Sequence, residues 1–377
     1  RRSSDLAFNA AYHTKMGVYH HDMGIKKGGK LAILAGAGPM GLGALTYALH
    51  RDVRPGMVVV TDINEDRLAR AESLFPPKEV KEKDGIDLYF VNTANMADPA
   101  AELRELTGGT GFDDVFCYAP IAPVVELSER LVQITPDGLS KVFYADNGSS
   151  GIEVALKMSH HYWINSGQPG KKRFITLTNS YHGETVAAMS VGDVALFTDT
   201  YKALLLDTLK VPSPDCYLRP EGMGWEEHSR NMFLAMEQTL ADNHDTVAAV
   251  IVEPLIQGAG GMRMYHPVYL KLLREACDRY GVHLIHDEIA VGFGRTGSMF
   301  ACEQAGIRPD FLCLSKALTG GYLPMAIVCT TDKIYDAFYD DYNKGKQFMH
   351  SHTYAGNPIG CATALAVLKI MKEVKIL

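Results

Sequence analysis

The stretch HLIHDEIAVGFGRTG at residues 283–297, with DFLCLSKALTGG at residues 310–321, decides the fold of this chain. Each stretch begins with a short apolar run that predicts a buried strand, and the two runs lead to Asp287 and Lys316. The carboxyl ends of neighbouring strands in an open α/β sheet border one crevice, and ligands bind there. We therefore expect this carboxylate and this amine to face each other across a ligand site.

An acid and a lysine in one crevice are the two groups that tune pyridoxal phosphate (PLP). A partly desolvated lysine forms the Schiff base that attaches this cofactor, and an acid keeps the nitrogen of its pyridine ring protonated. The alternative is a surface turn at Asp287 and a solvated loop lysine at Lys316. Lys316 lies between an apolar strand and a Gly-Gly turn, and that position favours the cofactor site.

Six motifs between Pro120 and the C-terminus occur in the order typical of one enzyme family. They are VFYADNGSSGIEVALKM, NSYHGET, VEPLIQGAGGMRMYHP, HDEIAVGFGRTG, LSKALTGG and HSHTYAGNPIGC. Residues 120–377 thus resemble the class III, or ω-type, aminotransferases of the fold-type I PLP enzymes, and among them the branch that works in biotin biosynthesis. The resemblance implies an α/β aminotransferase large domain at residues 120–336 and the start of a truncated C-terminal region at residues 337–377. The implied reaction moves an amino group from a donor, S-adenosylmethionine in that branch, to a keto acceptor, as in the synthesis of 7,8-diaminopelargonate.

The resemblance also assigns roles around the cofactor ring. Lys316 would attach PLP, Asp287 would hold the ring nitrogen, and Tyr181 would stack on the ring with His182 beside it. In the sequence, Tyr181 follows a predicted strand at residues 173–178 and precedes a glycine, where a ring can lie flat on a cofactor. A tyrosine in the core at the sheet edge is the alternative.

Small residues at a predicted helix N-terminus indicate an anion site. Residues 146–150, DNGSS, open a long helix, and free backbone amides at such a terminus bind anions. Gly148 and Ser149 would hold the phosphate of PLP, and an ordinary capped helix is the alternative.

Two further residues are candidates near the cofactor. Glu253 follows a β-branched strand predicted at residues 246–252, and it and Gln257 either contact the cofactor near its 3-hydroxyl, orient Asp287, or are structural. In the class III family the threonine of the HSHTYAGNP motif binds the phosphate of the neighbouring subunit's PLP. Carried over, this residue is Thr353, which implies a homodimer with the site at the interface; a helix-entry residue is the alternative.

A second fingerprint lies near the N-terminus, in LAILAGAGPMGLGALTYALH at residues 31–50. Gly36, Gly38 and Gly41 form G-x-G-x-x-G between a predicted strand and a helix, and the next strand ends in Asp62, 21 residues beyond Gly41. This arrangement predicts a Rossmann-like parallel sheet over residues 1–119 that binds NAD, with Asp62 on the ribose hydroxyls. A glycine turn without a nucleotide is the alternative.

The motifs AGAGPMGLGA, VVTDINEDRLARA and TGGTGFDDVFCYAP resemble the NAD-binding domain of zinc-type medium-chain dehydrogenases, near the sorbitol and sorbose-phosphate reductase branch. The chain is then an apparent chimera of two families. No cysteine occurs before Cys117, so we expect no metal site of the dehydrogenase kind. An NAD-dependent oxidoreductase, or a non-catalytic chimera, is the alternative to transamination.

The composition excludes several classes of protein. The 37 basic and 44 acidic residues give a net charge of −7, which argues against a nucleic-acid surface. Seven scattered cysteines contain no C-x-x-C pair and predict neither a disulfide framework nor a zinc knuckle, as expected in a reducing cytoplasm. No apolar run approaches the roughly 20 residues that span a bilayer, so we expect no membrane partner.

Overall fold

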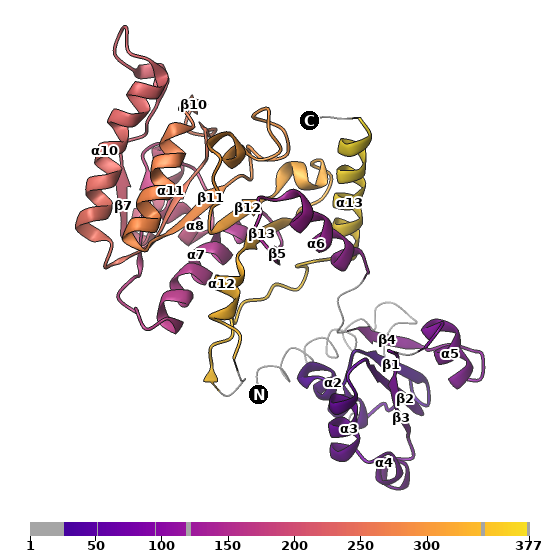
Figure 1. The fold of residues 1–377 in the computed structure, drawn as a ribbon. Coiled ribbons are helices and arrows are strands. Elements are labelled where there is room, and N and C mark those ends of the chain that lie inside the picture. The colour runs from indigo at the N-terminus through magenta and orange to yellow at the C-terminus, as the bar shows by residue number, and fades with distance from the viewer. Residues whose placement is uncertain (1–25, 51, 95, 118–121, 341–343, 375–377) are drawn as a thin grey trace. The chain divides into compact units, whose positions relative to one another are not determined.

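The computed structural model describes residues 26–50, 52–94, 96–117, 122–340 and 344–374 (Figure 1). The chain divides into two compact units, Arg1–Pro120 and Ile121–Leu377. Residues 1–25 of the first predicted domain, and Tyr118 at the end of its last predicted strand, lie outside the described residues. Within the described part of the chain, no helix combines the length and the apolar composition needed to cross a membrane.

The first unit contains a four-stranded parallel sheet in the order β3-β2-β1-β4, formed because strands and helices alternate along the chain. Its strands are β1 (Lys30–Leu34), β2 (Met57–Asp62), β3 (Asp87–Asn92) and β4 (Asp114–Cys117). Its helices are α2 (Pro39–His50), α3 (Glu65–Leu74), α4 (Pro77–Asp84) and α5 (Pro99–Leu106). We did not predict α4, because PKEVKEKD is almost wholly charged and only Val80 is buried.

The glycine fingerprint lies where β1 turns into α2. A Cβ built on Gly41 would lie 2.3 Å from the Cα of Gly36, so the two backbones touch and neither position has room for a side chain. The amide of Gly36 also donates to the carbonyl of Thr61, at 2.7 Å, which joins the turn to β2. The helix begins at Pro39, not at Leu42 as predicted, and the φ angle of proline suits a first helical turn.

The second unit contains a seven-stranded sheet in the order β5-β13-β12-β11-β8-β6-β7. Its strands are β5 (Lys141–Ala145), β6 (Arg173–Leu177), β7 (Thr208–Val211), β8 (Val247–Val252), β11 (His283–Asp287), β12 (Phe311–Leu314) and β13 (Ala326–Thr330). β13 runs antiparallel to both of its neighbours, and the other pairs are parallel. A separate two-stranded ribbon joins β9 (Ile256–Gln257) to β10 (Arg263–Met264).

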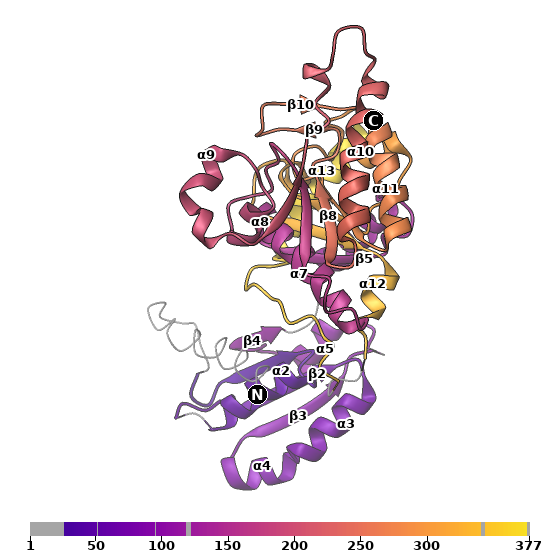
Figure 2. The ribbon, with the colours of Figure 1, turned by 90° about the vertical axis from the view of Figure 1, so that its left-hand side faces the viewer.

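Helices cover both faces of this sheet. The longer ones are α6 (Ala122–Ile134), α7 (Gly148–Asn165), α10 (Trp225–Asn243), α11 (Val268–Tyr280) and α13 (Pro358–Glu373). Short α-helices and 3-10 turns complete the unit: α8 (Val186–Ser190), α9 (Ala195–Thr198), α12 (Asp332–Asp336), η2 (Asp199–Leu204), η3 (Cys216–Leu218), η4 (Ala301–Ala305) and η5 (Lys316–Thr319). Figure 2 shows α10 and α11 side by side along the sheet.

The faces of the sheet follow from the alternation of side chains along each strand. Val250 and Leu284 belong to the core under α10 and α11, whereas Ile251 and Ile285 belong to the core under α7. Every residue of β8, β11, β12 and β13 is buried, as expected for central strands covered on both sides. A charged or polar side chain at the end of such a strand is therefore held on a defined face.

Most strands of the seven-stranded sheet agree with the prediction to within two residues, and β7 is the exception; the short strands β9 and β10 of the separate ribbon were not predicted either. Residues 192–246 were expected to contain only loops and a helix, but TLKV at residues 208–211 pairs with β6 as the last strand of the sheet. Half of this strand is polar and it has one buried residue, so the sequence carries no clear strand pattern.

Candidate active site

Asp287 and Lys316 lie at the carboxyl ends of adjacent parallel strands. Asp287 is the last residue of β11 and pairs in register with Cys313 of β12, three residues before Lys316. Both residues border one cavity of about 960 Å³. The cavity brings together seven of the residues predicted from the sequence, namely Gly148, Ser149, Tyr181, His182, Glu253, Asp287 and Lys316.

Asp287 is held by two hydrogen bonds. Its Oδ2 lies 2.7 Å from Nδ1 of His182, and its Oδ1 accepts from the amide of Ile289 at 3.1 Å. Asp287 and His182 are both buried, and Nε2 of His182 has no hydrogen-bond partner among the residues that the structure describes. The contact is satisfied when Nδ1 of His182 carries the proton, so the imidazole fixes the direction of the carboxylate.

Glu253 joins two loops at the edge of the cavity. Its Oε1 accepts from the amide of Tyr181 and its Oε2 accepts from the amide of Gly258, each at 2.8 Å. Burial raises the pKa of Glu253 to about 7, in spite of these two bonds. Gln257 is fully buried and donates to the carbonyl of Thr178 at 2.9 Å; it is not among the residues that border the cavity.

The N-terminus of α7 forms another wall. The side chain of Asn147 caps this helix by accepting from the amide of Ser150 at 3.0 Å, which explains why the helix begins at Gly148 and not at residue 152 as predicted. Ser149 Oγ accepts from the amide of Glu184 at 3.3 Å. Asn147, Gly148 and Ser149 border the cavity, and the N-terminus of a helix suits an anion.

Gly183 makes the approach of this helix possible. Its φ is +125°, and a Cβ there would lie 2.2 Å from Oγ of Ser149. Only glycine lets the loop after Tyr181 lie directly against the first turn of α7.

Tyr181 has a partly buried ring on the cavity wall. Its ring centroid lies 5.0 Å from that of Phe197, and its hydroxyl donates to Oε1 of Glu184 at 3.0 Å. Burial, followed by the neighbouring Glu184, raises the pKa of Tyr181 to about 12, so the phenol stays protonated.

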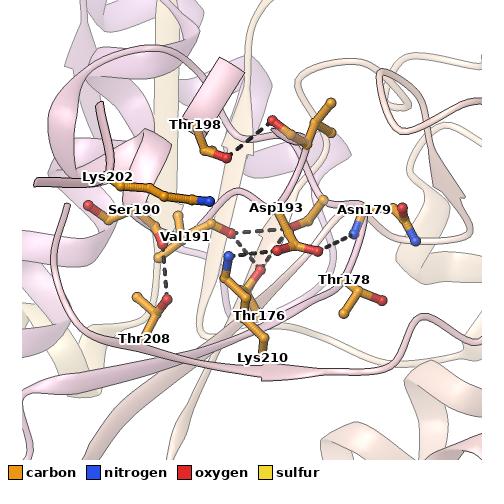
Figure 3. A network of polar contacts seen from close by, with 12 residues as sticks. Thr176, Thr178, Asn179, Ser190, Val191, Asp193, Thr198, Lys202, Thr208 and Lys210 are labelled. Atoms are coloured by element: carbon orange, nitrogen blue, oxygen red, sulfur yellow. Dashed lines mark hydrogen bonds and ion pairs between the residues drawn. The ribbon is translucent and has the colours of Figure 1, made fainter. Parts of the chain in front are cut away.

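Asp193 anchors Asn179, which lies two residues before Tyr181 in the loop after β6 (Figure 3). Oδ2 of Asp193 accepts from the amide of Asn179 at 3.1 Å, and Oδ1 accepts from Nζ of Lys210 at 2.6 Å. Oγ1 of Thr176 and Oγ of Ser180 lie 2.9 Å from each other and 2.6 and 3.1 Å from the carbonyl oxygen of Val191, and their two protons serve two of these three contacts. This network fixes the end of β6 and allows Asn179 its left-handed φ of +61°.

Lys316 has an unusual backbone. Its φ is +41°, which is rare for a residue with a side chain, and strain of this kind concentrates at functional positions. Ser315 supports the turn by donating from Oγ to the carbonyl of Met325 at 2.6 Å. The side chain of Lys316 is exposed, so the partly desolvated surroundings that we predicted for it are wrong for this structure.

The Aminotransferase class-III family profile matches residues 115–377. The chain belongs to the class III aminotransferase family. The cavity just described therefore lies in the class III aminotransferase part of the chain.

Named relatives support the same grouping. The chain is similar to the adenosylmethionine-8-amino-7-oxononanoate aminotransferases of Aquifex aeolicus, with 47% identity over 67% of this chain and 55% of the relative, and of Geobacter sulfurreducens, with 46% identity over 67% and 56%. Among solved structures it is similar to the enzyme of that name from Methanocaldococcus jannaschii, with a TM-score of 0.63, 38% identity, and coverage of 68% of this chain and 57% of that one. An omega transaminase from Pseudomonas jessenii in complex with PMP gives a TM-score of 0.65 at 33% identity, with coverage of 68% and 57%. The chain spans little more than half the length of these relatives.

Five predicted residues lie elsewhere in this class III aminotransferase. Thr353 is exposed and does not border the cavity of its own chain. Gly36, Gly38, Gly41 and Asp62 belong to the first unit. Oδ1 of Asp62 accepts from the two amides that follow it, at 2.9 and 3.1 Å, so the carboxylate closes the turn after β2.

The sequence interpretation missed two charged residues on the cavity wall, Glu184 and Arg295. The signal for Glu184 was its place three residues after Tyr181, in the same strand-end loop. The signal for Arg295 was a lone cation in the glycine-rich turn after Asp287. Its side chain is exposed.

Proposed function

We propose that this chain carries the catalytic core of a PLP-dependent transaminase of biotin synthesis, which moves an amino group to a keto substrate to form 7,8-diaminopelargonate. The observation that carries the proposal is the meeting of Lys316 with the His182–Asp287 pair in one cavity at the ends of β11 and β12. The names of the relatives, which combine adenosylmethionine with 8-amino-7-oxononanoate, support S-adenosylmethionine as donor and the 7-oxo compound as acceptor.

The cavity suits PLP in three respects. The capped N-terminus of α7 offers amides to a phosphate next to Gly148 and Ser149. A Cβ on Gly148 would lie 3.2 Å from the side chain of Ile289, so glycine keeps this cradle open. The buried carboxylate of Asp287, oriented by His182, suits a protonated ring nitrogen.

In this proposal Lys316 attaches the cofactor, Asp287 holds the ring nitrogen and Tyr181 stacks on the ring. Bound PLP would supply an electron sink for negative charge at the donor carbon. Asp287 would keep the ring nitrogen protonated, because the positive charge on that nitrogen stabilises the adjacent buried carboxylate. Once released by the incoming donor, the amine of Lys316 would accept the proton from the donor carbon and deliver it to the cofactor carbon C4′.

Arg295 would contribute to binding the substrate. An exposed guanidinium on the wall of a cavity presents a planar pair of donors, which matches a carboxylate. The acceptor in the proposed reaction is a carboxylic acid, and we assign Arg295 to the binding of its carboxylate.

The proposed enzyme acts as a homodimer. Thr353 is exposed and lies outside its own cavity, as the family resemblance requires of a residue that reaches the phosphate in the neighbouring subunit. We keep the reducing cytoplasm as the expected compartment, and the six cysteines that the structure describes are free and buried.

The decisive experiment titrates the full chain with PLP and follows the visible absorbance. Wild type should gain an absorbance band shifted from that of free PLP, and reduction with borohydride should attach the cofactor covalently to Lys316. Lys316→Ala should show neither the shifted band nor the covalent attachment. Lys271→Ala, an exposed lysine on α11, is the matched control and should behave like wild type. A band that persists in Lys316→Ala, or modification of other lysines only, would disprove the assignment.

As a second candidate function, we propose that the first unit binds NAD. The supporting observation is the direct contact of Gly36 with Gly41 at the start of α2, because it leaves the helix N-terminus open to a pyrophosphate. A Cβ on Gly38 would meet no atom within 4 Å, so Gly38→Ala should fold normally and only obstruct a ligand. NADH fluorescence should rise with wild type and much less with Gly38→Ala. Equal responses of the two proteins, or none, would refute this binding and leave the transaminase proposal untouched.

A further inference from the structure

His286 carries an imidazole ring that is buried in the core of the second unit. It precedes Asp287 on β11 and therefore points to the opposite face of the sheet, on the side of Leu284. The ring is fully buried, and neither Nδ1 nor Nε2 has a partner in the described part of the chain. A buried polar group without a partner destabilises the fold unless something satisfies it. The transaminase proposal gives this residue no task.

Two other potential metal ligands surround the ring. One donor atom from each of His286, Glu288 and Cys302 lies within 4.8 Å of the others, and all three side chains are buried. Nδ1 of His286 lies 3.9 Å from Oε1 of Glu288. An imidazole nitrogen, a carboxylate oxygen and a thiol sulfur together form a donor set typical of Zn²⁺.

Glu288 is fixed in place by the backbone. Its two oxygens accept from the amides of Ala301 and Cys302 at 2.7 and 2.9 Å, which joins the end of β11 to η4. These two hydrogen bonds hold the Glu288 carboxylate in one orientation, as the hydrogen-bond partners of metal ligands do in metal sites.

The charges of the cluster also suit a dication. Burial lowers the pKa of His286 to about 3, so the ring is neutral, which is the form that binds metal ions. The carboxylate of Glu288 and the thiolate of Cys302 would together neutralise a charge of +2. In the metal-free protein, burial raises the pKa of the Cys302 thiol well above its usual range.

We propose that His286, Glu288 and Cys302 bind one divalent cation of the zinc type behind the candidate active site. Binding forms bonds from the imidazole, the carboxylate and the sulfur to the ion, and the proton of the Cys302 thiol, with any proton that Glu288 holds, leaves to solvent. In a tetrahedral site with bonds of about 2.0–2.3 Å the ligand atoms lie about 3.3–3.8 Å apart. Donor atoms that lie within 4.8 Å of one another here would therefore approach by up to about 1–1.5 Å on binding. The ion would join β11 to η4 and support the strand that carries Asp287.

Cobalt is the probe that identifies the ligands. The full chain, stripped with a chelator, is titrated with Co²⁺ and then with competing Zn²⁺. We expect one ion per chain and a thiolate-to-cobalt charge-transfer band, because the cluster contains the thiol of Cys302. The melting temperature should rise with either ion.

Three variants make the test specific. Cys302→Ser should abolish the charge-transfer band, and His286→Phe should weaken binding by more than about 100-fold, since even outer-shell changes cost 10- to 100-fold. Cys313→Ala removes a buried cysteine on the other face of the sheet and should keep the band. His286→Phe also replaces an unpaired polar ring with an apolar one, so its metal-free form should melt at or above the wild-type temperature.

Other outcomes would overturn the proposal. A protein without a charge-transfer band, or one whose band survives Cys302→Ser, does not have this site. Binding without the band that disappears in His352→Ala would place the ion at the exposed pair of His352 with Asp146, whose Nδ1 and Oδ2 lie 2.7 Å apart. A melting increase of equal size in wild type and His286→Phe would equally exclude the cluster.

Discussion

Nδ1 of His182 lies 2.7 Å from Oδ2 of Asp287, and both side chains are buried. The two residues are 105 positions apart in the chain. They meet because β6, after which His182 lies, and β11, which ends in Asp287, flank β8 in the sheet. The Asp287 carboxylate is therefore held in one orientation toward a ligand in the cavity.

Replacing His182 should weaken PLP binding. His182→Ala leaves the Asp287 carboxylate free to rotate, and a hydrogen bond to a charged group is worth about 1.5–3 kcal/mol. We expect PLP affinity to fall by about 10- to 100-fold, measured by absorbance titration. His182→Asn, whose amide can still donate toward Asp287, should recover part of the loss. His161→Ala, a half-buried histidine on α7, is the control and should bind as wild type; an equal loss there would point to general destabilisation.

Asp193 should matter more than the lysine that it pairs with. Asp193→Ala removes the acceptor for the amide of Asn179, and we expect a loss of about 1–3 kcal/mol in the free energy of unfolding. Lys210→Met removes only a partly exposed ion pair, which is worth about 1 kcal/mol or less. Both tryptophans, Trp163 and Trp225, lie in the second unit, so their fluorescence in urea reports its unfolding. Equal losses in the two variants would mean that the ion pair, and not the amide bond, anchors the loop.

The protonation of Glu253 should make stability depend on pH. Its folded pKa of about 7 lies above the ordinary value near 4.3 of an unfolded glutamate, so the folded state holds more protons between these values. The stabilisation is complete below the unfolded pKa and is lost as pH rises through about 7. We expect the contribution of Glu253, measured as the difference in free energy of unfolding between wild type and Glu253→Gln, to fall by a few kcal/mol between about pH 5 and pH 8.

Glu288 contributes to the same slope, because burial raises its pKa to about 7 as well. The buried imidazoles of His283 and His286 act in the opposite direction below about pH 6.5, because burial lowers their pKa values to about 4 and about 3. The comparison of wild type with Glu253→Gln isolates Glu253 from these groups. Urea unfolding of both proteins at several pH values measures the difference directly, and a pH dependence that Glu253→Gln leaves unchanged would contradict the assignment.

The sequence predicted the strands with apolar patterns and the residues at their ends. Asp287 and Lys316 could be placed because each follows a short run rich in apolar residues, and adjacent parallel strands end at one edge. The His182–Asp287 contact could not be predicted from spacing, since it depends on β8 lying between β6 and β11. The roles of Glu253 and Asp193 were also out of reach, because both accept from backbone amides of a loop whose path the sequence does not specify. β7 was missed because an edge strand needs no apolar alternation.

Gly183→Ala is the sharpest steric test of the candidate phosphate cradle. The new Cβ would lie 2.2 Å from Oγ of Ser149 at a φ of +125°, so both the backbone and the contact resist it. We expect a loss of about 2–5 kcal/mol in the free energy of unfolding and at least tenfold weaker PLP binding. Gly167→Ala, at the other end of α7, has a φ of +76° and no atom within 4 Å of its Cβ.

The Gly167→Ala control introduces backbone strain without a steric clash. Its free energy of unfolding should therefore fall by only about 1–2 kcal/mol, and its affinity for PLP should not change. Inorganic phosphate, titrated against PLP, separates the two possible causes of weaker binding. If Ser149 and the α7 N-terminus hold the phosphate, Gly183→Ala should lose affinity for phosphate and PLP in parallel. If only PLP is affected, the displaced loop acts through Tyr181 and His182, and the phosphate site must be sought elsewhere on the cavity wall.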